Sequence, residues 1–144
     1  MEGVFPESGT QIRGQSLLEA QWVMARALQI GEWERSMDHR SLLPYLREEV
    51  VEFEQAVREL DDDASEDNLL KELSDILLQV LFHAELARRR DSFDLDDVAA
   101  AFVSKMRSRA PYLFEEGDGI ISIAEQERLW AEGKAQEKAQ RPRE

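Results

Sequence analysis

The sequence contains no cysteine and no hydrophobic run long enough to span a membrane. Without thiols, neither a disulfide framework nor a thiolate metal site can form. Basic residues are also scarce, because 18 Lys and Arg stand against 31 Asp and Glu and leave a net charge of −13. This balance argues against a nucleic-acid polymer or a membrane surface as the main partner, since both attract clustered cations. A small phosphorylated ligand stays open, because a bound divalent cation inverts the local field.

The length of 144 residues suits one domain with a core of its own. Residues 1–13 hold two glycines and one proline without periodicity, and they predict a flexible N-terminal arm. A single domain is predicted at 14–138, followed by a flexible tail at 139–144. No basic segment followed by an apolar one resembles a signal peptide, which predicts a cytoplasmic protein.

Apolar residues recur at helical spacing along most of the chain, and no segment is a confident strand. The predicted helices cover about 17–30, 41–60, 67–90, 95–109 and 123–138. Within 41–60, alternating three- and four-residue steps predict a packed seam. Its members are Leu43, Leu46, Val50, Phe53, Val57 and Leu60. The predicted fold class is all-α, with the helices packed as an antiparallel bundle.

Carboxylates occupy two of these helices at spacings that let them converge. The helix at 41–60 carries Glu48, Glu49 and Glu52, which would be ordinary surface residues if they stood alone. The next helix carries Glu72 and Asp75 inside an otherwise apolar run. Burying unpaired carboxylates is costly, so a cation between them is expected. Hard oxygen ligands suit Mg²⁺ or Mn²⁺, which bind phosphates and activate a water.

Cations and aromatic residues elsewhere in the chain could hold a phosphorylated ligand. Lys105 and Arg109 are four residues apart on one helix face, and Lys134 follows in the last helix. Trp33 or Trp130 could offer an aromatic face to a base. The alternative is that the cations form surface ion pairs and the tryptophans belong to the core.

An ordered set of motifs resembles the MazG-type nucleoside triphosphate pyrophosphohydrolases over about residues 15–138. Glu48-Glu49-Val50-Val51-Glu52 and Glu72-Leu73-Ser74-Asp75 match an EExxE…ExxD pattern, Lys105 with Arg109 matches KxxxR, and Trp130 with Lys134 matches WxxxK. The segment Ser41-Leu42-Leu43-Pro44-Tyr45-Leu46 is similar to the SLxPYLxEE run that precedes the acidic motif.

The resemblance implies an α-helical, Mg²⁺-dependent house-cleaning hydrolase that converts (d)NTP to (d)NMP and diphosphate. It implies that the metal ligands are Glu48, Glu49, Glu52, Glu72 and Asp75, with one glutamate helping to deprotonate the attacking water. It implies that the nucleotide is held by Lys105, Arg109, Trp130 and Lys134. It also implies a homodimer, or a dimer-based homo-oligomer, whose helices complete one another's bundle.

Two alternatives to a general pyrophosphohydrolase stay open. One is a deoxynucleotide-specific enzyme of the all-α dUTPase type, and the other is an acidic helical protein that binds partners through the 43–60 seam. A carboxylate-bridged di-iron bundle is excluded, because Glu-x-x-His is needed on two helices. Val80 precedes His83 by three positions, and the residue three before His39 is Ser36. The segment 108–114 lacks two histidines of the family pattern, which leaves the base preference open.

Overall fold

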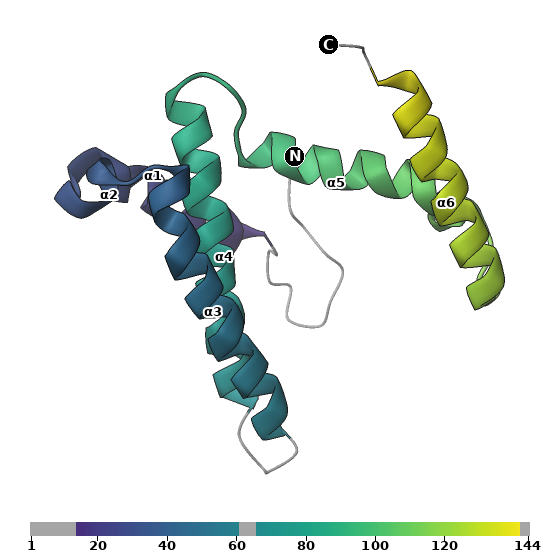
Figure 1. Ribbon diagram of the computed structural model, residues 1–144, viewed down its shortest axis with the longest axis horizontal. Helices are drawn as coiled ribbons and strands as arrows, with labels where there is room; N and C mark the ends of the chain where they lie inside the picture. The colour runs from purple at the N-terminus through teal and green to yellow at the C-terminus, as the bar shows by residue number, and fades with distance from the viewer. Residues whose placement is uncertain (1–13, 61–65, 142–144) are drawn as a thin grey trace. The chain divides into compact units, whose positions relative to one another are not determined.

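The computed structural model describes residues 14–60 and 66–141, and every regular element in these two ranges is a helix. Along the chain (Figure 1) they are α1 (Gln15–Ile30), α2 (Glu32–Ser36), α3 (His39–Glu59), α4 (Glu66–Arg89), α5 (Leu95–Arg109), the 3₁₀ helix η2 (Pro111–Phe114) and α6 (Ile123–Gln140). The predicted all-α class is confirmed. No helix in the described ranges has the length and apolar character needed to cross a membrane.

The boundaries of the helices follow the predicted ranges closely. The short helices α2 and η2 were not predicted, because single turns leave little periodic signal. The predicted arm at 1–13 lies outside the described residues. Positions 139 and 140 of the predicted tail belong to α6, and 142–144 lie outside the described residues.

The chain divides into two compact units between Leu95 and Asp96. The first unit contains α1 to α4, and the second contains the remainder of α5, η2 and α6. The single domain predicted at 14–138 therefore stays a prediction.

In the first unit, α3 and α4 run antiparallel side by side, and α1 packs on α4 (Figure 1). The buried core lies where these three helices meet, and each large apolar side chain buried there contributes roughly 1.5–3 kcal/mol. Its members are Met24 and Leu28 of α1, Leu42 of α3, and Leu81 and Phe82 of α4.

A capping box fixes where α3 begins. The Asp38 carboxylate accepts from the Ser41 backbone N–H at 2.8 Å, and the Ser41 hydroxyl oxygen accepts from the Asp38 backbone N–H at 2.8 Å. These reciprocal bonds satisfy donors at the helix start, and the bond from the Ser41 backbone N–H lowers the pKa of the Asp38 carboxylate. Because the cap fixes the residue at which α3 begins, it helps to determine which side chains of α3 face α4.

The α3 stripe that packs inside the first unit differs from the predicted seam. Leu42 and Ala56 are buried, and Glu49 lies halfway between them at the same seven-residue spacing. Val50 and Val57 of the predicted seam are instead 50% and 44% exposed. Three other members of the predicted seam, Leu46, Phe53 and Leu60, are half-buried, so the seam lies only partly on the packed side of α3. The exposed half of the seam carries the valines, whereas the most buried positions include a small residue, Ala56.

In the second unit, α6 crosses α5 near the C-terminal end of α5 (Figure 1). Gly133 is buried at this crossing, and a Cβ there would collide with the backbone carbonyl of Ser108. The Ser108 hydroxyl donates to the Gly133 carbonyl oxygen at 3.4 Å. A glycine thus permits close backbone contact between the two helices.

Candidate functional site

Four carboxylates from the antiparallel helices α3 and α4 converge in the first unit. One oxygen of each lies within 4.8 Å of the others. Two residues three apart on each helix form the group, which consists of Glu49, Glu52, Glu72 and Asp75. This acidic group is compatible with a divalent metal ion, because hard cations are bound by carboxylate oxygens.

The electrostatics of this acidic group are unfavourable without a cation. Glu72 is only 7% exposed. Among the described residues, the buried Oε1 atoms of Glu49 and Glu72 have no hydrogen-bond partner. Burial, followed by the charges of Asp75 and the other acids nearby, raises the pKa of Glu49. The nearest compensation for Glu72 is Lys71, whose exposed Nζ lies 3.6 Å from Oε2. Buried acceptors without partners cost about 1–3 kcal/mol each, so the group fits a cation.

Glu48 is the predicted ligand that the structure leaves outside the group of four. Its side chain is exposed, one position before Glu49 on α3. Its charge contributes to the raised pKa of Glu49. A direct role for Glu48 as a ligand stays a prediction.

The polar stripe of α4 continues beyond the carboxylates. Gln79, one turn after Asp75, is 4% exposed, and its Oε1 has no hydrogen-bond partner among the described residues. One turn further, His83 Nδ1 lies 2.6 Å from His39 Nδ1, and the two ring planes are nearly parallel, with centroids 4.9 Å apart. No local sequence pattern indicated the pairing of His83 with His39, because the two residues are far apart in the chain.

A second group of predicted residues comes together where α5 meets α6. Arg109 donates through Nε to Glu137 Oε2 at 3.2 Å and through Nη2 to Glu137 Oε1 at 2.8 Å. The guanidinium carbon lies 5.0 Å from the ring centroid of Trp130. The hydrogen bonds from Arg109 are the main reason that the pKa of Glu137 is held at about 2.

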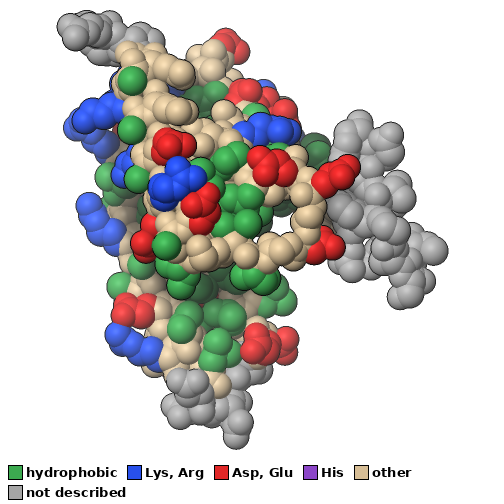
Figure 2. Space-filling model, turned by 90° about the vertical axis from the view of Figure 1, so that its right-hand side faces the viewer, with side chains coloured by type: hydrophobic (Ala, Val, Ile, Leu, Met, Phe, Trp, Pro, Cys, Tyr) green, Lys and Arg blue, Asp and Glu red, His purple; other side chains and the backbone are tan. Residues whose placement is uncertain are grey.

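The remaining predicted cations lie on the same two helices. Lys134, on α6, lines an open cavity of about 580 Å³ together with Trp130 and Tyr112. Lys105 is exposed on α5, and its charge helps to lower the pKa of Glu137. Figure 2 shows hydrophobic and charged side chains interspersed on the face that it draws. The second unit thus gathers the predicted phosphate-binding residues.

Trp33 lies in the first unit, apart in the chain from the other predicted substrate-binding residues. Its ring packs edge-on against Tyr45 at 5.5 Å and against Phe82 at 6.0 Å. It is still 47% exposed. These contacts account for Trp33 as a packing residue, and its binding of a base stays a prediction.

Fold and site together define an all-α protein with a carboxylate cluster suited to a divalent metal ion. Residues 37–114, more than half of the chain, match the MazG nucleotide pyrophosphohydrolase domain. The chain therefore belongs to the MazG family.

Relatives from two bacteria agree with this assignment. The nucleoside triphosphate pyrophosphohydrolase/pyrophosphatase MazG of Thermotoga maritima is 39% identical over 110 residues, which are 76% of this chain and 40% of that protein. A nucleoside triphosphate pyrophosphohydrolase of Mycolicibacterium smegmatis is 42% identical over 127 residues, which are 87% of this chain and 37% of that protein. The chain thus spans about two fifths of the length of these relatives.

A solved structure shares the fold along nearly its whole length. The crystal structure of a mazG-related protein from Thermotoga maritima superposes with a TM-score of 0.70 at 30% identity. The match covers 82% of this chain and 98% of that chain.

Proposed function

We propose that this chain is a Mg²⁺-dependent nucleoside triphosphate pyrophosphohydrolase that converts a (d)NTP and water to the (d)NMP and diphosphate. The observation that carries the proposal is the convergence of four carboxylates with two buried, unpartnered oxygens. A cation would relieve the repulsion within such a group, and triphosphates are substrates that a hard divalent ion binds. The names of the relatives support the same reaction.

Different residues of the chain would bind the metal, bind the phosphates and accept the proton. The metal would be held by Glu49, Glu52, Glu72 and Asp75, and Mn²⁺ could replace Mg²⁺ in such an oxygen site. When bound, the ion neutralises the carboxylates and lowers the pKa of a coordinated water. Lys105, Arg109 and Lys134 supply positive charge for the phosphate oxygens as charge develops on them. A glutamate near the ion would take the proton of the attacking water.

The same proposal includes a homodimer or a dimer-based homo-oligomer. Large apolar side chains remain exposed along both helices that carry the acidic group. They are Val50, Val51 and Val57 of α3, and Leu70, Leu73, Leu77, Leu78 and Val80 of α4, each between 38% and 68% exposed. Extended apolar faces of this kind are typical of obligate interfaces. A second copy of the chain would cover them and complete the bundle.

The house-cleaning role is also part of the proposal, with common or altered (d)NTPs as substrates. The cytoplasmic location stays a prediction from the sequence.

Diphosphate release from the eight common NTPs and dNTPs, measured with Mg²⁺, tests the function. We expect release by the wild-type protein and a loss of at least about a hundredfold in Glu72→Gln and Asp75→Asn. Glu54→Gln is the matched control, because Glu54 lies on α3 in an exposed ion pair with Arg58 and outside the acidic group.

The outcome separates the alternatives. A steep preference for dUTP would support the deoxynucleotide-specific enzyme. Equal release by wild-type and Glu72→Gln protein would contradict the metal site. A folded protein that binds Mg²⁺ but hydrolyses none of these eight triphosphates would contradict common (d)NTPs as the substrates.

A further inference from the structure

Among the described residues, Glu137 is the one hydrogen-bonding partner that the structure gives to the guanidinium of Arg109. The pair is side-on and bidentate, with N···O distances of 3.2 and 2.8 Å. The side chain of Arg109 is 16% exposed and that of Glu137 is 37% exposed. A bidentate pair of this kind is directional, and it fixes an orientation as well as contributing energy.

The close crossing of α5 and α6 explains why the two side chains meet. Gly133 brings the α6 backbone against Ser108 and Arg109, because a Cβ would meet the Ser108 carbonyl and the Arg109 Cα. Glu137 follows Gly133 by one helical turn and therefore lies on the same face of α6. The packing of α6 on α5 thus places the Glu137 carboxylate beside Arg109.

The pair leaves part of the guanidinium available to a ligand. Glu137 takes the Nε–H and one N–H of Nη2. A guanidinium has five N–H donors, so both donors of Nη1 and the second donor of Nη2 are not used by this pair. The Trp130 ring lies against the same guanidinium, with its centroid 5.0 Å away. Two contacts therefore restrain the group without using the end-on fork formed by Nη1 and Nη2, and such a fork matches two phosphate oxygens.

We propose that Glu137 is a positioning residue, which orients the Arg109 fork to bind a phosphate group of the triphosphate. Because Arg109 meets a triphosphate only if the chain is the hydrolase proposed above, this role rests on the proposed function. The Glu137 carboxylate is charged at neutral pH, and the hydrogen bonds from Arg109 lower its pKa to about 2. The guanidinium is then held in place before the ligand arrives, which lowers the entropic cost of binding.

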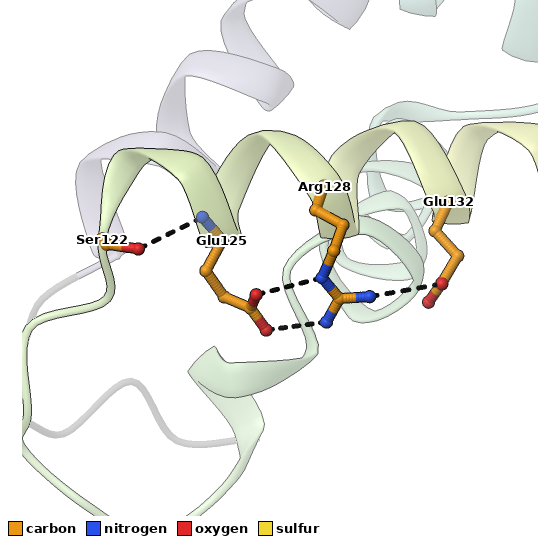
Figure 3. Close-up of polar contacts among 4 residues, drawn as sticks. All are labelled: Ser122, Glu125, Arg128 and Glu132. Atoms are coloured by element: carbon orange, nitrogen blue, oxygen red, sulfur yellow. Dashed lines mark hydrogen bonds and ion pairs between the residues drawn. The ribbon is translucent and has the colours of Figure 1, made fainter.

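A second ion pair on α6 provides a matched control (Figure 3). Arg128 donates to Glu125 in the same side-on manner, with N···O distances of 3.0 and 2.7 Å. These side chains are 56% and 45% exposed, and Arg128 also contacts Glu132 at 3.5 Å. Glu125→Gln therefore makes the same chemical change in an exposed pair outside the proposed site.

The first test is a double-mutant cycle on diphosphate release with Mg²⁺. We expect Glu137→Gln to lower kcat/KM by about tenfold to a hundredfold, the range for a misplaced binding group. In an Arg109→Ala background the same change should have almost no further effect, because Glu137 acts through Arg109. Glu125→Gln should leave kcat/KM unchanged. An equal loss in both backgrounds, or a rise in kcat/KM for Glu137→Gln, would overturn the positioning role.

A second test does not depend on turnover. In ¹H–¹⁵N spectra, the Nε–H signal of Arg109 is identified as the one that disappears in Arg109→Lys. We expect the chemical shift of this signal to change in Glu137→Gln and to stay the same in Glu125→Gln. Calorimetric titration with inorganic tripolyphosphate and Mg²⁺ should show about tenfold weaker binding by Glu137→Gln than by the wild-type protein. Equal affinity, or no binding by either, would overturn the role of Glu137. Tripolyphosphate binding without diphosphate release from any nucleotide would instead count against the proposed reaction alone.

Discussion

His39 and His83 are 44 positions apart in the chain, yet their Nδ1 atoms are 2.6 Å apart. Arg90 Nη1 lies 2.8 Å from His39 Nε2, and an arginine can only donate. His39 therefore accepts at Nε2, carries its proton on Nδ1 and donates to Nδ1 of His83. The proton of a neutral His83 is then on Nε2, which is buried and without a partner among the described residues. The arrangement requires both rings to be neutral.

This pair predicts a loss of stability in mild acid. Burial, followed by the charge of His39, lowers the pKa of His83 below its ordinary value of 6.5. The unfolded chain therefore binds the proton more readily, and the contribution to stability is present above pH 6.5 and lost as the pH falls through the folded pKa. We expect the urea midpoint to fall between pH 7.5 and pH 5.5, and to fall less in His83→Gln. The same decrease in both proteins would assign the effect to carboxylates instead.

The acidic group predicts stabilisation by divalent ions. The carboxylates of Glu49 and Glu72, each with a buried oxygen that has no partner among the described residues, repel each other until a cation is bound. An ion that binds only the folded protein adds about 2.7 kcal/mol at a concentration 100 times its Kd. We expect Mg²⁺ and Mn²⁺ to raise Tm in the wild-type protein and in Glu54→Gln, and to raise it much less in Glu72→Gln. Equal shifts in all three proteins would place the ion elsewhere.

Local patterns were sufficient to find the acidic group but not its surroundings. Glu72 and Asp75 stood out because carboxylates are rare in an apolar helix, and that signal is contained in a few adjacent residues. The pair between Arg109 and Glu137 depends on how closely α5 and α6 approach, which no spacing along the chain reports. Glu137 follows Lys134 by three positions, so its place on α6 was predictable, but its partner was not.

The predicted seam shows a limit of a different kind. Apolar periodicity cannot tell which of two adjacent stripes is covered within the chain and which is left for a partner. Val50 and Val57 gave the stronger pattern, and both are exposed. Leu42 and Ala56 are buried on the neighbouring stripe, with an acid between them that hides the pattern.

The ion pair between Glu85 and Arg88 predicts that removing the Arg88 side chain lowers the free energy of unfolding. Glu85 is only 4% exposed, and Arg88 donates three hydrogen bonds of 2.6–3.1 Å to its carboxylate. Arg88→Ala would leave a buried carboxylate without its partner, and because the Arg88 side chain is itself 49% exposed, we expect about 1–3 kcal/mol of destabilisation. Arg128→Ala, which removes a cation from the exposed pair with Glu125, should cost no more than about 1 kcal/mol. Equal free energies of unfolding for the two variants would contradict this account.

The crossing at Gly133 predicts a variant that harms activity without touching a charged group. In Gly133→Ala the new Cβ would collide with the backbone carbonyl of Ser108, so α6 must move away from α5. Overpacking of this kind costs about 1–3 kcal/mol, and it would also separate Glu137 from Arg109. We expect a lower Tm and a fall in kcat/KM, together with the shift of the Arg109 Nε–H signal that Glu137→Gln produces. Gly119→Ala is the control, because a Cβ there meets no atom within 4 Å. An unchanged Nε–H signal in Gly133→Ala would show that the pair does not depend on the close approach of the two helices.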